Sequence, residues 1–246
     1  MLLLVAITIF GISINVYATE PYYTTANGIE LTREEYEFLT TFYWSGYPDV
    51  MTRAQYEQMV DDDLFSAEIV TETSNGLGSG FIGPVNNPQG DTNVQNGRTL
   101  QIAKACPPTK CYMSLVATWS IDPYSLGYDV IGAYLYNVSL IAHSHTYVST
   151  NAYTYYFENL RTEANGHGLG NSVLLPENGT DYIINMAFTT TKGGTVFGSY
   201  QHAMEDTTLA NSQLYTFSMG GYGNVFSFYG TAEDIYDQTA GVDINV

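Results

Sequence analysis

Apolar and polar residues alternate along the stretch from Cys111 to Ile121, near the middle of the chain. The apolar set recurs at every second position, namely Met113, Leu115, Ala117, Trp119 and Ile121. A period of two places alternate side chains on opposite faces of a β-strand, whereas a helix repeats every 3.6 residues. Asp122-Pro123 then starts a turn, and a second apolar run extends from Tyr128 to Leu140. The pattern predicts two strands at the centre of a β-sandwich.

The chain from Thr99 onward consists mainly of similar short runs, separated by turns rich in Gly, Pro, Asn and Asp. We predict strands at Thr99–Cys106, Cys111–Ile121, Tyr128–Leu140, Ala142–Ser149, Thr154–Leu160, Gly168–Leu174, Asp181–Thr190, Thr195–Met204, Gln213–Ser218, Gly223–Tyr229 and Gly241–Val246. Asp181–Thr190 is partly apolar on both faces, which is typical of a central strand. Many strands at short spacing predict a mainly β fold, an antiparallel, jelly-roll-like β-sandwich.

A nine-residue pattern occurs twice before this β-region, as LTREEYEFL at 31–39 and as MTRAQYEQM at 51–59. Each copy places a Thr three residues before a Glu or Gln, which is the capping box of a helix start. Apolar residues then recur at helical spacing on one face. We predict an N-terminal helical hairpin formed by Thr32–Tyr43 and Thr52–Asp62, joined by a helix-breaking link at Ser45–Asp49.

The first eighteen residues are apolar and carry no charged side chain. Val16-Tyr17-Ala18 fits the small-residue pattern before a signal-peptidase site, so we expect residues 1–18 to be a signal peptide. The alternative is an uncleaved membrane anchor, for which the run is short. We divide the remaining chain into a helical hairpin at 19–66, a strand with a Gly/Asn/Pro-rich linker or loop at 67–98, and a β-sandwich domain at 99–246.

The chain is strongly acidic, with 25 Asp+Glu against seven Lys+Arg and a formal net charge of −18. Such a charge repels nucleic acids and anionic membrane surfaces, so we expect neither as a partner. Acidity of this kind fits an exported, soluble protein or one that attracts cations. The partner we expect is a cell-wall or extracellular polysaccharide or a protein. The chain is expected to be secreted, extracellular or at the cell surface.

Two cysteines, Cys106 and Cys111, flank the segment Pro107-Pro108-Thr109-Lys110. In an exported chain this spacing indicates a local disulfide that closes a hairpin. The alternative is a redox or metal pair, but the spacing is not CxxC and two cysteines alone cannot complete a zinc site.

Several segments together resemble, in sequence and in order, an uncharacterised family of secreted proteins of Gram-positive bacteria. The segments are NGIELTREEYEFL, ATWSIDP with GYDVIGAYLYN, GGTVFGSYQHA, and GYGNVF with IYDQTAGV. They span most of the chain from Asn27 to Val242. The resemblance implies a layout of signal peptide, helical hairpin and β-domain. It implies no activity, ligand or catalytic residue.

Histidines offer one candidate metal site. His143 and His145 are two residues apart in a predicted strand, so we expect both imidazoles on the same face, where they can share a metal ion. His167 or His202 is the candidate for a third ligand. The alternative is two polar residues on an edge strand.

Acidic residues offer two further possibilities. Asp61–Asp63 clusters carboxylates as a Ca²⁺ site would, but without the DxDxDG spacing, and a solvated helix end is the alternative. A glycosidase needs two facing carboxylates, for which the candidates near strands are Glu158, Glu163, Asp181 and Glu205. The chain contains no GxSxG elbow or other catalytic motif, so we assign no catalytic residue and no cofactor.

Tyrosine is the remaining signal, with 22 copies in the chain. Tyr134 and Tyr136 share one strand face, as do Tyr153 and Tyr155, and rows of exposed Tyr can stack on sugars or dock a protein. The alternative is that these rings cover the core or pair across strands. We therefore predict a non-catalytic binding module. A carbohydrate-active hydrolase and an assembly protein that docks through the helical hairpin are the alternatives.

Overall fold

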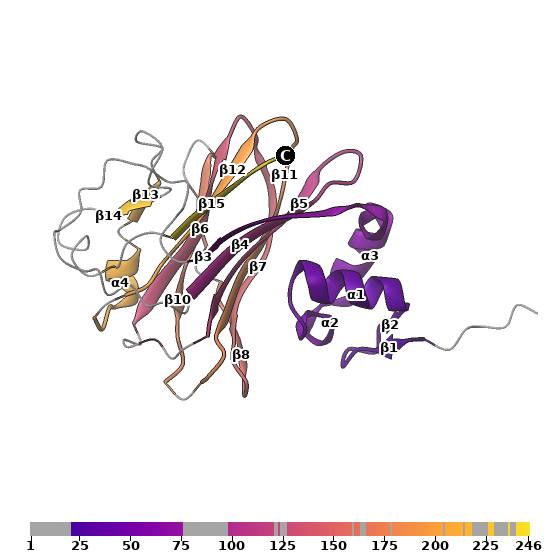
Figure 1. Ribbon diagram of the computed structural model, residues 1–246, viewed down its shortest axis with the longest axis horizontal. Helices are drawn as coiled ribbons and strands as arrows, with labels where there is room; N and C mark the ends of the chain where they lie inside the picture. Colours follow the sequence, from indigo (N-terminus) through magenta and orange to yellow (C-terminus); the bar gives the residue numbers. More distant parts are fainter. Residues whose placement is uncertain are drawn as a thin grey trace, which may run out of the picture.

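The computed structural model describes residues 21–75, 98–120, 123, 127–158, 160–162, 166–177, 179–203, 205–213, 215–217, 226–228, 236 and 240–246 (Figure 1). The helices in these ranges are α1 (Arg33–Phe42), α2 (Tyr47–Val50), α3 (Arg53–Asp61), the 3₁₀ helix η1 (Leu64–Ser66) and α4 (Leu209–Ser212). The predicted signal peptide and most of the predicted linker lie outside the described residues.

The described strands form two large antiparallel sheets. The six-stranded sheet has the order β3 (Ile69–Asn75), β4 (Arg98–Ala105), β5 (Cys111–Trp119), β11 (Ile183–Thr190), β7 (Leu140–Ser149) and β8 (Thr154–Tyr156). The five-stranded sheet has the order β15 (Ala240–Asn245), β12 (Thr195–Gln201), β6 (Tyr128–Tyr136), β10 (Gly168–Leu174) and β9 (Arg161–Thr162). Two small ribbons pair β1 (Tyr23–Thr24) with β2 (Glu30–Leu31) and β13 (Tyr215–Phe217) with β14 (Phe226–Phe228).

The main core lies between the two sheets, and β5 shows how the sequence builds it. The predicted alternation is confirmed, because Met113, Leu115, Ala117 and Trp119 are all buried in this core. They share the core with the inward residues of β6, namely Ile131, Ala133 and Leu135. Apolar burial of this extent is the main force that holds the two sheets together.

The predicted fold class is confirmed: the protein is mainly β, with antiparallel sheets and N-terminal helices. The chain passes between the sheets repeatedly, so that strands far apart in sequence become neighbours. Thus β11 lies between β5 and β7, and β6 lies between β12 and β10. The prediction of β11 as a central strand is also confirmed.

One predicted strand, Tyr128–Leu140, is wrong in its length. The structure ends β6 at Tyr136 and begins β7 at Leu140, in the other sheet. Asn137 has φ of 57°, a left-handed conformation that Asn tolerates better than most residues and that breaks the strand. Apolar runs on both sides of the turn concealed it in the sequence.

The strand predicted inside the linker region is present as β3, and it pairs with β4 along its whole length. It is therefore an edge strand of the six-stranded sheet. The segment that begins at Ile69 belongs to the sandwich and not to a connection between domains.

The two predicted helix starts are confirmed in detail. The Thr32 side chain accepts a hydrogen bond from the Glu35 backbone at 3.2 Å, and the Glu35 carboxylate accepts one from the Thr32 backbone at 2.8 Å. Thr52 and Gln55 form the same capping box at the start of α3. The link predicted to break the first helix follows the end of α1, and it also contains the short helix α2. Its Pro48 is tolerated because the first turn of a helix needs no intrahelical N–H donor there.

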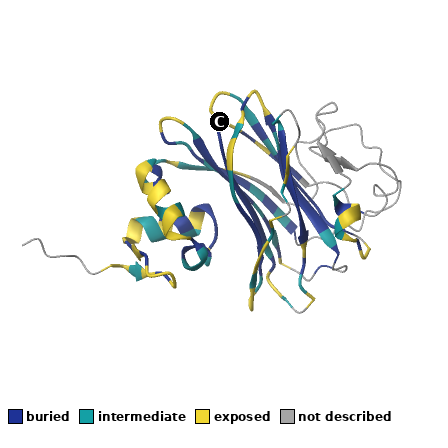
Figure 2. Cartoon of the chain, turned by 180° about the vertical axis from the view of Figure 1, so that it is seen from behind, coloured by how far each residue is buried: buried dark blue, intermediate teal, exposed yellow. Residues whose placement is uncertain are grey.

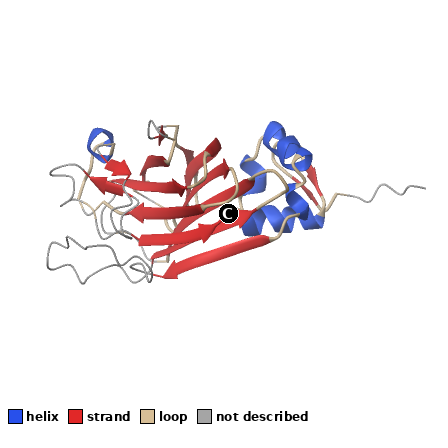
Figure 3. Cartoon of the chain, turned by 90° about the horizontal axis from the view of Figure 1, so that it is seen from above, coloured by secondary structure: helices blue, strands red, loops and turns tan. Residues whose placement is uncertain are grey.

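The helices α1–α3 lie beside one face of the six-stranded sheet, while α4 lies at the opposite end of the molecule (Figures 1 and 3). A second apolar cluster joins them to the sheet. It contains Phe38, Leu39, Phe42, Tyr43, Trp44, Tyr47, Met51 and Met59 from the helical region and Ala103, Ala105, Tyr112, Tyr147 and Ala187 from the strands. Val60 of α3 is exposed and does not belong to this cluster. Figure 2 shows the resulting pattern, with largely buried strands and helices that expose their outer faces.

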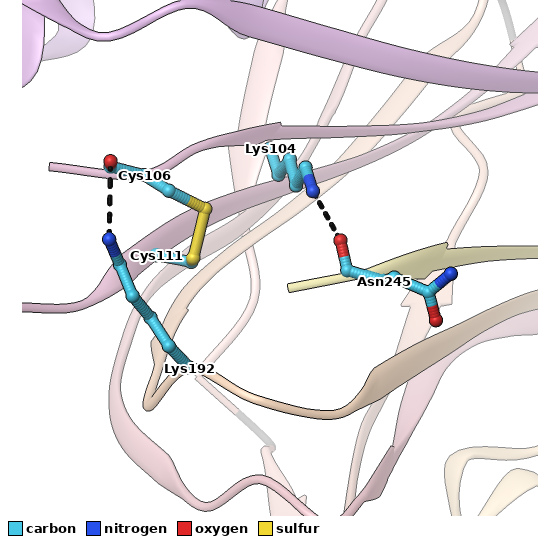
Figure 4. Close-up of a disulfide and its surroundings, with 5 residues drawn as sticks. All are labelled: Lys104, Cys106, Cys111, Lys192 and Asn245. Carbon is cyan, nitrogen blue, oxygen red and sulfur yellow. Dashed lines mark hydrogen bonds between the residues drawn. A yellow bond between two sulfur atoms is a disulfide. The ribbon is translucent and has the colours of Figure 1, made fainter.

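The predicted disulfide between Cys106 and Cys111 is present at the turn from β4 to β5. Neighbouring elements are attached to this corner of the sandwich (Figure 4). The Lys192 ammonium donates to the Cys106 carbonyl at 3.5 Å, and the Lys104 ammonium donates to the carbonyl of Asn245 in β15.

Replacing both cysteines by serine should lower the free energy of unfolding by about 2 kcal/mol, because the disulfide restricts only a short loop of the unfolded chain. Urea denaturation of the double variant and of the wild type, with and without reductant, measures this effect. Reductant should destabilise the wild type alone. A loss larger than about 4 kcal/mol would show that the disulfide does more than close this loop.

Candidate functional site

Three exposed aromatic side chains lie at the corner between β7 and β8. Tyr153 is 64% exposed, Tyr155 42% and Tyr156 53%. The rings of Tyr153 and Tyr155 are 6.2 Å apart, as their predicted common face requires. The turn before them is held by Thr150, whose hydroxyl accepts from the backbone of Tyr153 at 3.1 Å. We call Tyr153, Tyr155 and Tyr156 the tyrosine edge.

The other predicted tyrosine pair lies on a different sheet. Tyr134 and Tyr136 are in β6, on the outer face of the five-stranded sheet. Tyr136 is 45% exposed, but Tyr134 is half-buried and stacks on His167, with 6.3 Å between ring centroids. The structure therefore divides the four predicted ligand-binding tyrosines between two surfaces.

The predicted common face of His143 and His145 is wrong. A β-bulge at Ser144 places His145 opposite Ala187 of β11 and His143 opposite the next residue, Phe188. Because consecutive residues of β11 face opposite sides, the two imidazoles also do. Among the described residues no group of three or more His, Cys, Asp or Glu side chains is arranged to hold a metal ion.

His145 instead belongs to a buried aromatic contact between the helices and the sheet. Its ring centroid lies 5.0 Å from that of Tyr47 and 5.1 Å from that of Tyr147, and its Nε2 is 3.1 Å from the Asn185 side-chain oxygen. The ring of Trp44 lies 3.6 Å from that of Tyr147. Burial lowers the pKa of His145 to about 3 and raises the pKa of Tyr147 well above its usual value. This contact could not be predicted from the sequence, because its residues come from separate elements.

The sequence left two interpretations of Asp61–Asp63 open, a Ca²⁺ site and a solvated helix end, but in the structure Asp62 is bonded to the sheet. It forms an ion pair with Lys110 at 2.6 Å and accepts hydrogen bonds from the Tyr112 hydroxyl and from Gln58, at 3.1 Å. Burial raises the pKa of this carboxyl, but the hydrogen bonds from Lys110, Tyr112 and Gln58 outweigh it, so the pKa is lowered. Asp62 therefore fixes the helical region to the β4–β5 hairpin.

An open groove of about 400 Å³ lies directly beside this contact. It runs between α3 and the outer face of the six-stranded sheet, and its lining comes from α3, β5, β7, β11 and Lys110 of the β4–β5 turn. We call it the helix–sheet groove. The sequence did not predict it, since it exists only because α3 rests on distant strands.

The carboxylates proposed for hydrolysis are not gathered around this groove, whose lining contains none. Glu158, Asp181 and Glu205 are exposed and lie in three separate connections, and Glu163 lies outside the described residues. The helices, in turn, use their apolar face on the chain's own sheet. The assembly hypothesis thereby loses the surface on which it was based.

A buried polar cluster fills one end of the sandwich core. Asp129 accepts hydrogen bonds from the Tyr200 hydroxyl and from the Ala203 backbone at 2.8 Å, and its Oδ1 lies 2.9 Å from Nδ1 of His202. The Trp119 indole donates to the Tyr200 hydroxyl at 3.0 Å. All of these groups are almost inaccessible to solvent. The sequence did not identify this cluster.

Comparison with known proteins does not assign the chain to a family. No family model matches the chain, and no curated protein matches it in sequence. The KRT10-binding region domain of the pneumococcal serine rich repeat protein PsrP is similar over 56% of this chain and 86% of its own, with 11% identity and a TM-score of 0.33. A Streptococcus parasanguinis Fap1 structure, from work on pH-induced modulation of adhesion by Fap1 fimbriae, covers 72% of this chain and 95% of its own, with 13% identity and a TM-score of 0.35. At such TM-scores these likenesses carry no conclusion about function.

Within the described residues, no helix has the length and apolar character needed to cross a bilayer.

Proposed function

We propose that the protein is a secreted or cell-surface binding protein without catalytic activity, and that it docks a protein partner through the tyrosine edge. The Cys106–Cys111 disulfide supports export, because disulfides persist in oxidising compartments. The resemblance of the sequence to secreted proteins of Gram-positive bacteria supports it as well.

The exposure of Tyr153 and Tyr155, whose rings lie 6.2 Å apart, carries this proposal, and Tyr156 is exposed on the opposite face of β8. Tyrosine presents a large amphipathic surface and loses little conformational entropy when it is fixed, so it is enriched in the energetic centres of interfaces. Such rings are normally placed on the surface singly, and a cluster of them is a feature of binding surfaces. Among the strands that the structure describes, β8 is also the last of its sheet, and the outer backbone edge of such a strand can pair with a partner.

The pair Tyr134 and Tyr136 is a weaker candidate. Tyr134 already stacks on His167, so less of its ring is available for contact. The rings of Tyr153 and Tyr155 are tilted by 56° and do not form a flat platform of the kind that stacks on a polysaccharide chain. This favours a protein as the partner of the tyrosine edge.

We expect Tyr153→Ala/Tyr155→Ala to weaken binding to the protein partner by tenfold or more, because each ring at an interface centre contributes about 1–2 kcal/mol. Binding is measured against an immobilised panel of extracellular proteins and by co-sedimentation with Gram-positive cell wall and insoluble polysaccharides. The matched control is Tyr134→Ala/Tyr136→Ala, with the same chemical change on the other sheet.

Equal losses in both double variants would contradict the proposed site. Retention on an insoluble polysaccharide, with no protein bound, would replace the protein partner by a carbohydrate. No binding to either panel would leave the proposed function without support.

A further inference from the structure

The helix–sheet groove has the size and lining of a small-molecule site. Its volume of about 400 Å³ lies within the range of about 300–1,000 Å³ that is usual for such sites. It lies near the first residues of β7, whereas the tyrosine edge adjoins the last residues of that strand. The two surfaces are therefore separate, and a ligand in the groove is independent of the proposed function.

Polar groups without a hydrogen-bond partner face this groove. Thr189 is only 5% exposed, and the hydroxyls of Thr189 and Ser144 have no partner among the described residues. Ser144 is turned toward the groove by the bulge in β7. Gln55 uses its side-chain oxygen in the capping box, so its amide N–H groups remain as donors. The Thr189 hydroxyl is not among the buried side-chain groups that lack a partner, so solvent reaches it in the groove and a ligand there would take the place of water.

The charges around the groove cancel. Lys110 is the charged residue of its lining, and the ion pair with Asp62 neutralises it. The same carboxylate also holds Gln58 and Tyr112, so one residue fixes the positions of three lining side chains. The groove is thus preorganised and presents hydroxyls and amides without net charge, which disfavours ionic ligands.

Apolar side chains complete the opposite part of the lining. Ile141 is 50% exposed, although it is a large aliphatic residue, and Met59 and Ala142 lie with it in the groove. A pyranose ring has this same division, with hydroxyls around its edge and C–H groups on its face.

We propose that the helix–sheet groove binds a short neutral saccharide, with Thr189, Ser144 and Gln55 bonding its hydroxyls and Ile141 covering its apolar face. The probes are the neutral disaccharides chitobiose, cellobiose, maltose and lactose. Binding is followed by NMR titration of the protein, in which the side-chain amide signals of Gln55 and Gln58 report directly on the groove.

At least one disaccharide should shift these signals in a saturable manner. Thr189→Val, which keeps the side-chain shape, should weaken that binding about tenfold, because one hydrogen bond to the ligand is lost. Ser144→Ala should weaken it by a similar factor. The matched control is Thr71→Val, an exposed position on β3 of the same sheet, which should bind as the wild type does.

Three results would overturn the proposal. In the first, no disaccharide shifts the Gln55 and Gln58 signals at millimolar concentration. In the second, the shifts persist unchanged in Thr189→Val and Ser144→Ala. In the third, a neutral Gly-Ser tetrapeptide moves the signals and no sugar does. Tyr153→Ala/Tyr155→Ala should bind the disaccharide normally, so failure of this proposal is distinguishable from failure of the proposed function.

Discussion

Asp129→Asn should lower the free energy of unfolding by about 3–5 kcal/mol, the usual cost of removing one partner from a buried charged network. The Asp129 carboxylate has no solvent exposure, and its two oxygens are occupied by the Tyr200 hydroxyl, the Ala203 N–H and the His202 ring. Asparagine replaces one of these acceptors by an NH₂ group. At least one donor then faces another donor, in a place that water cannot reach.

The surrounding charges make the effect larger than the loss of one hydrogen bond. Arg98 is buried in the same cluster, with its guanidinium 5.4 Å from the Trp119 ring and 5.6 Å from the Tyr200 ring. Without the carboxylate this end of the core keeps the buried positive charge of Arg98 and loses the negative charge of Asp129. Burying a charge in a low-dielectric region is unfavourable unless an opposite charge is nearby.

Guanidinium unfolding at pH 7, followed by far-UV circular dichroism, measures the change. Asp243→Asn is the matched control, because Asp243 is exposed on β15 and the substitution alters charge and shape in the same way. We expect the control to change the free energy of unfolding by no more than about 0.5 kcal/mol. Equal midpoints for Asp129→Asn and Asp243→Asn would refute the structural role of the Asp129 cluster.

Local features of the fold could be predicted from the sequence because they depend on neighbouring residues. The alternation at 111–121 identified β5, and the repeated Thr-x-x-Glu/Gln pattern identified the starts of α1 and α3. The five-residue spacing of Cys106 and Cys111 identified the disulfide for the same reason. Each of these signals is complete within a dozen residues.

The sites could not be predicted because they are assembled from distant parts of the chain. The Asp129 cluster joins β6 with residues of β4, β5 and β12, and the helix–sheet groove joins α3 to β7 and β11. The histidine prediction failed for a related reason. A rule of strict alternation cannot anticipate that Ser144 forms a bulge, since the bulge appears only in the pairing with β11.

Acid should destabilise the protein well before its carboxylates titrate, through His145 and His143. Burial lowers the pKa of His145 to about 3 and that of His143 to about 4, from an ordinary value of 6.5. Burial is the main cause for His145, and the hydrogen bond with the Asn185 side-chain oxygen, which favours the imidazolium, does not outweigh it. Both rings are therefore neutral in the folded protein above about pH 4.

The sign of the effect follows from proton binding in the two states. Between pH 6.5 and about 4 the unfolded chain binds a proton on each histidine and the folded protein does not, so acid favours unfolding. Each histidine should lower the free energy of unfolding by about 1.4 kcal/mol for each pH unit below 6.5. Above pH 6.5 the histidines are neutral in both states, so they no longer lower the free energy of unfolding. Paired carboxylates such as Asp62, whose pKa is lowered, add to the loss only at more acidic pH.

The measurement is guanidinium unfolding at intervals between pH 7 and pH 4.5. His145→Gln should be less stable than the wild type at pH 7, since it loses aromatic packing. As the pH falls, however, its free energy of unfolding should decrease less than that of the wild type, by a difference of about 1.4 kcal/mol per pH unit. Tyr147→Phe is the control, because it alters the same buried contact without changing a group that titrates in this range. It should keep the wild-type slope. Parallel curves for His145→Gln and the wild type would mean that His145 is protonated in the folded state, and its buried position against Tyr47 and Tyr147 would then be wrong.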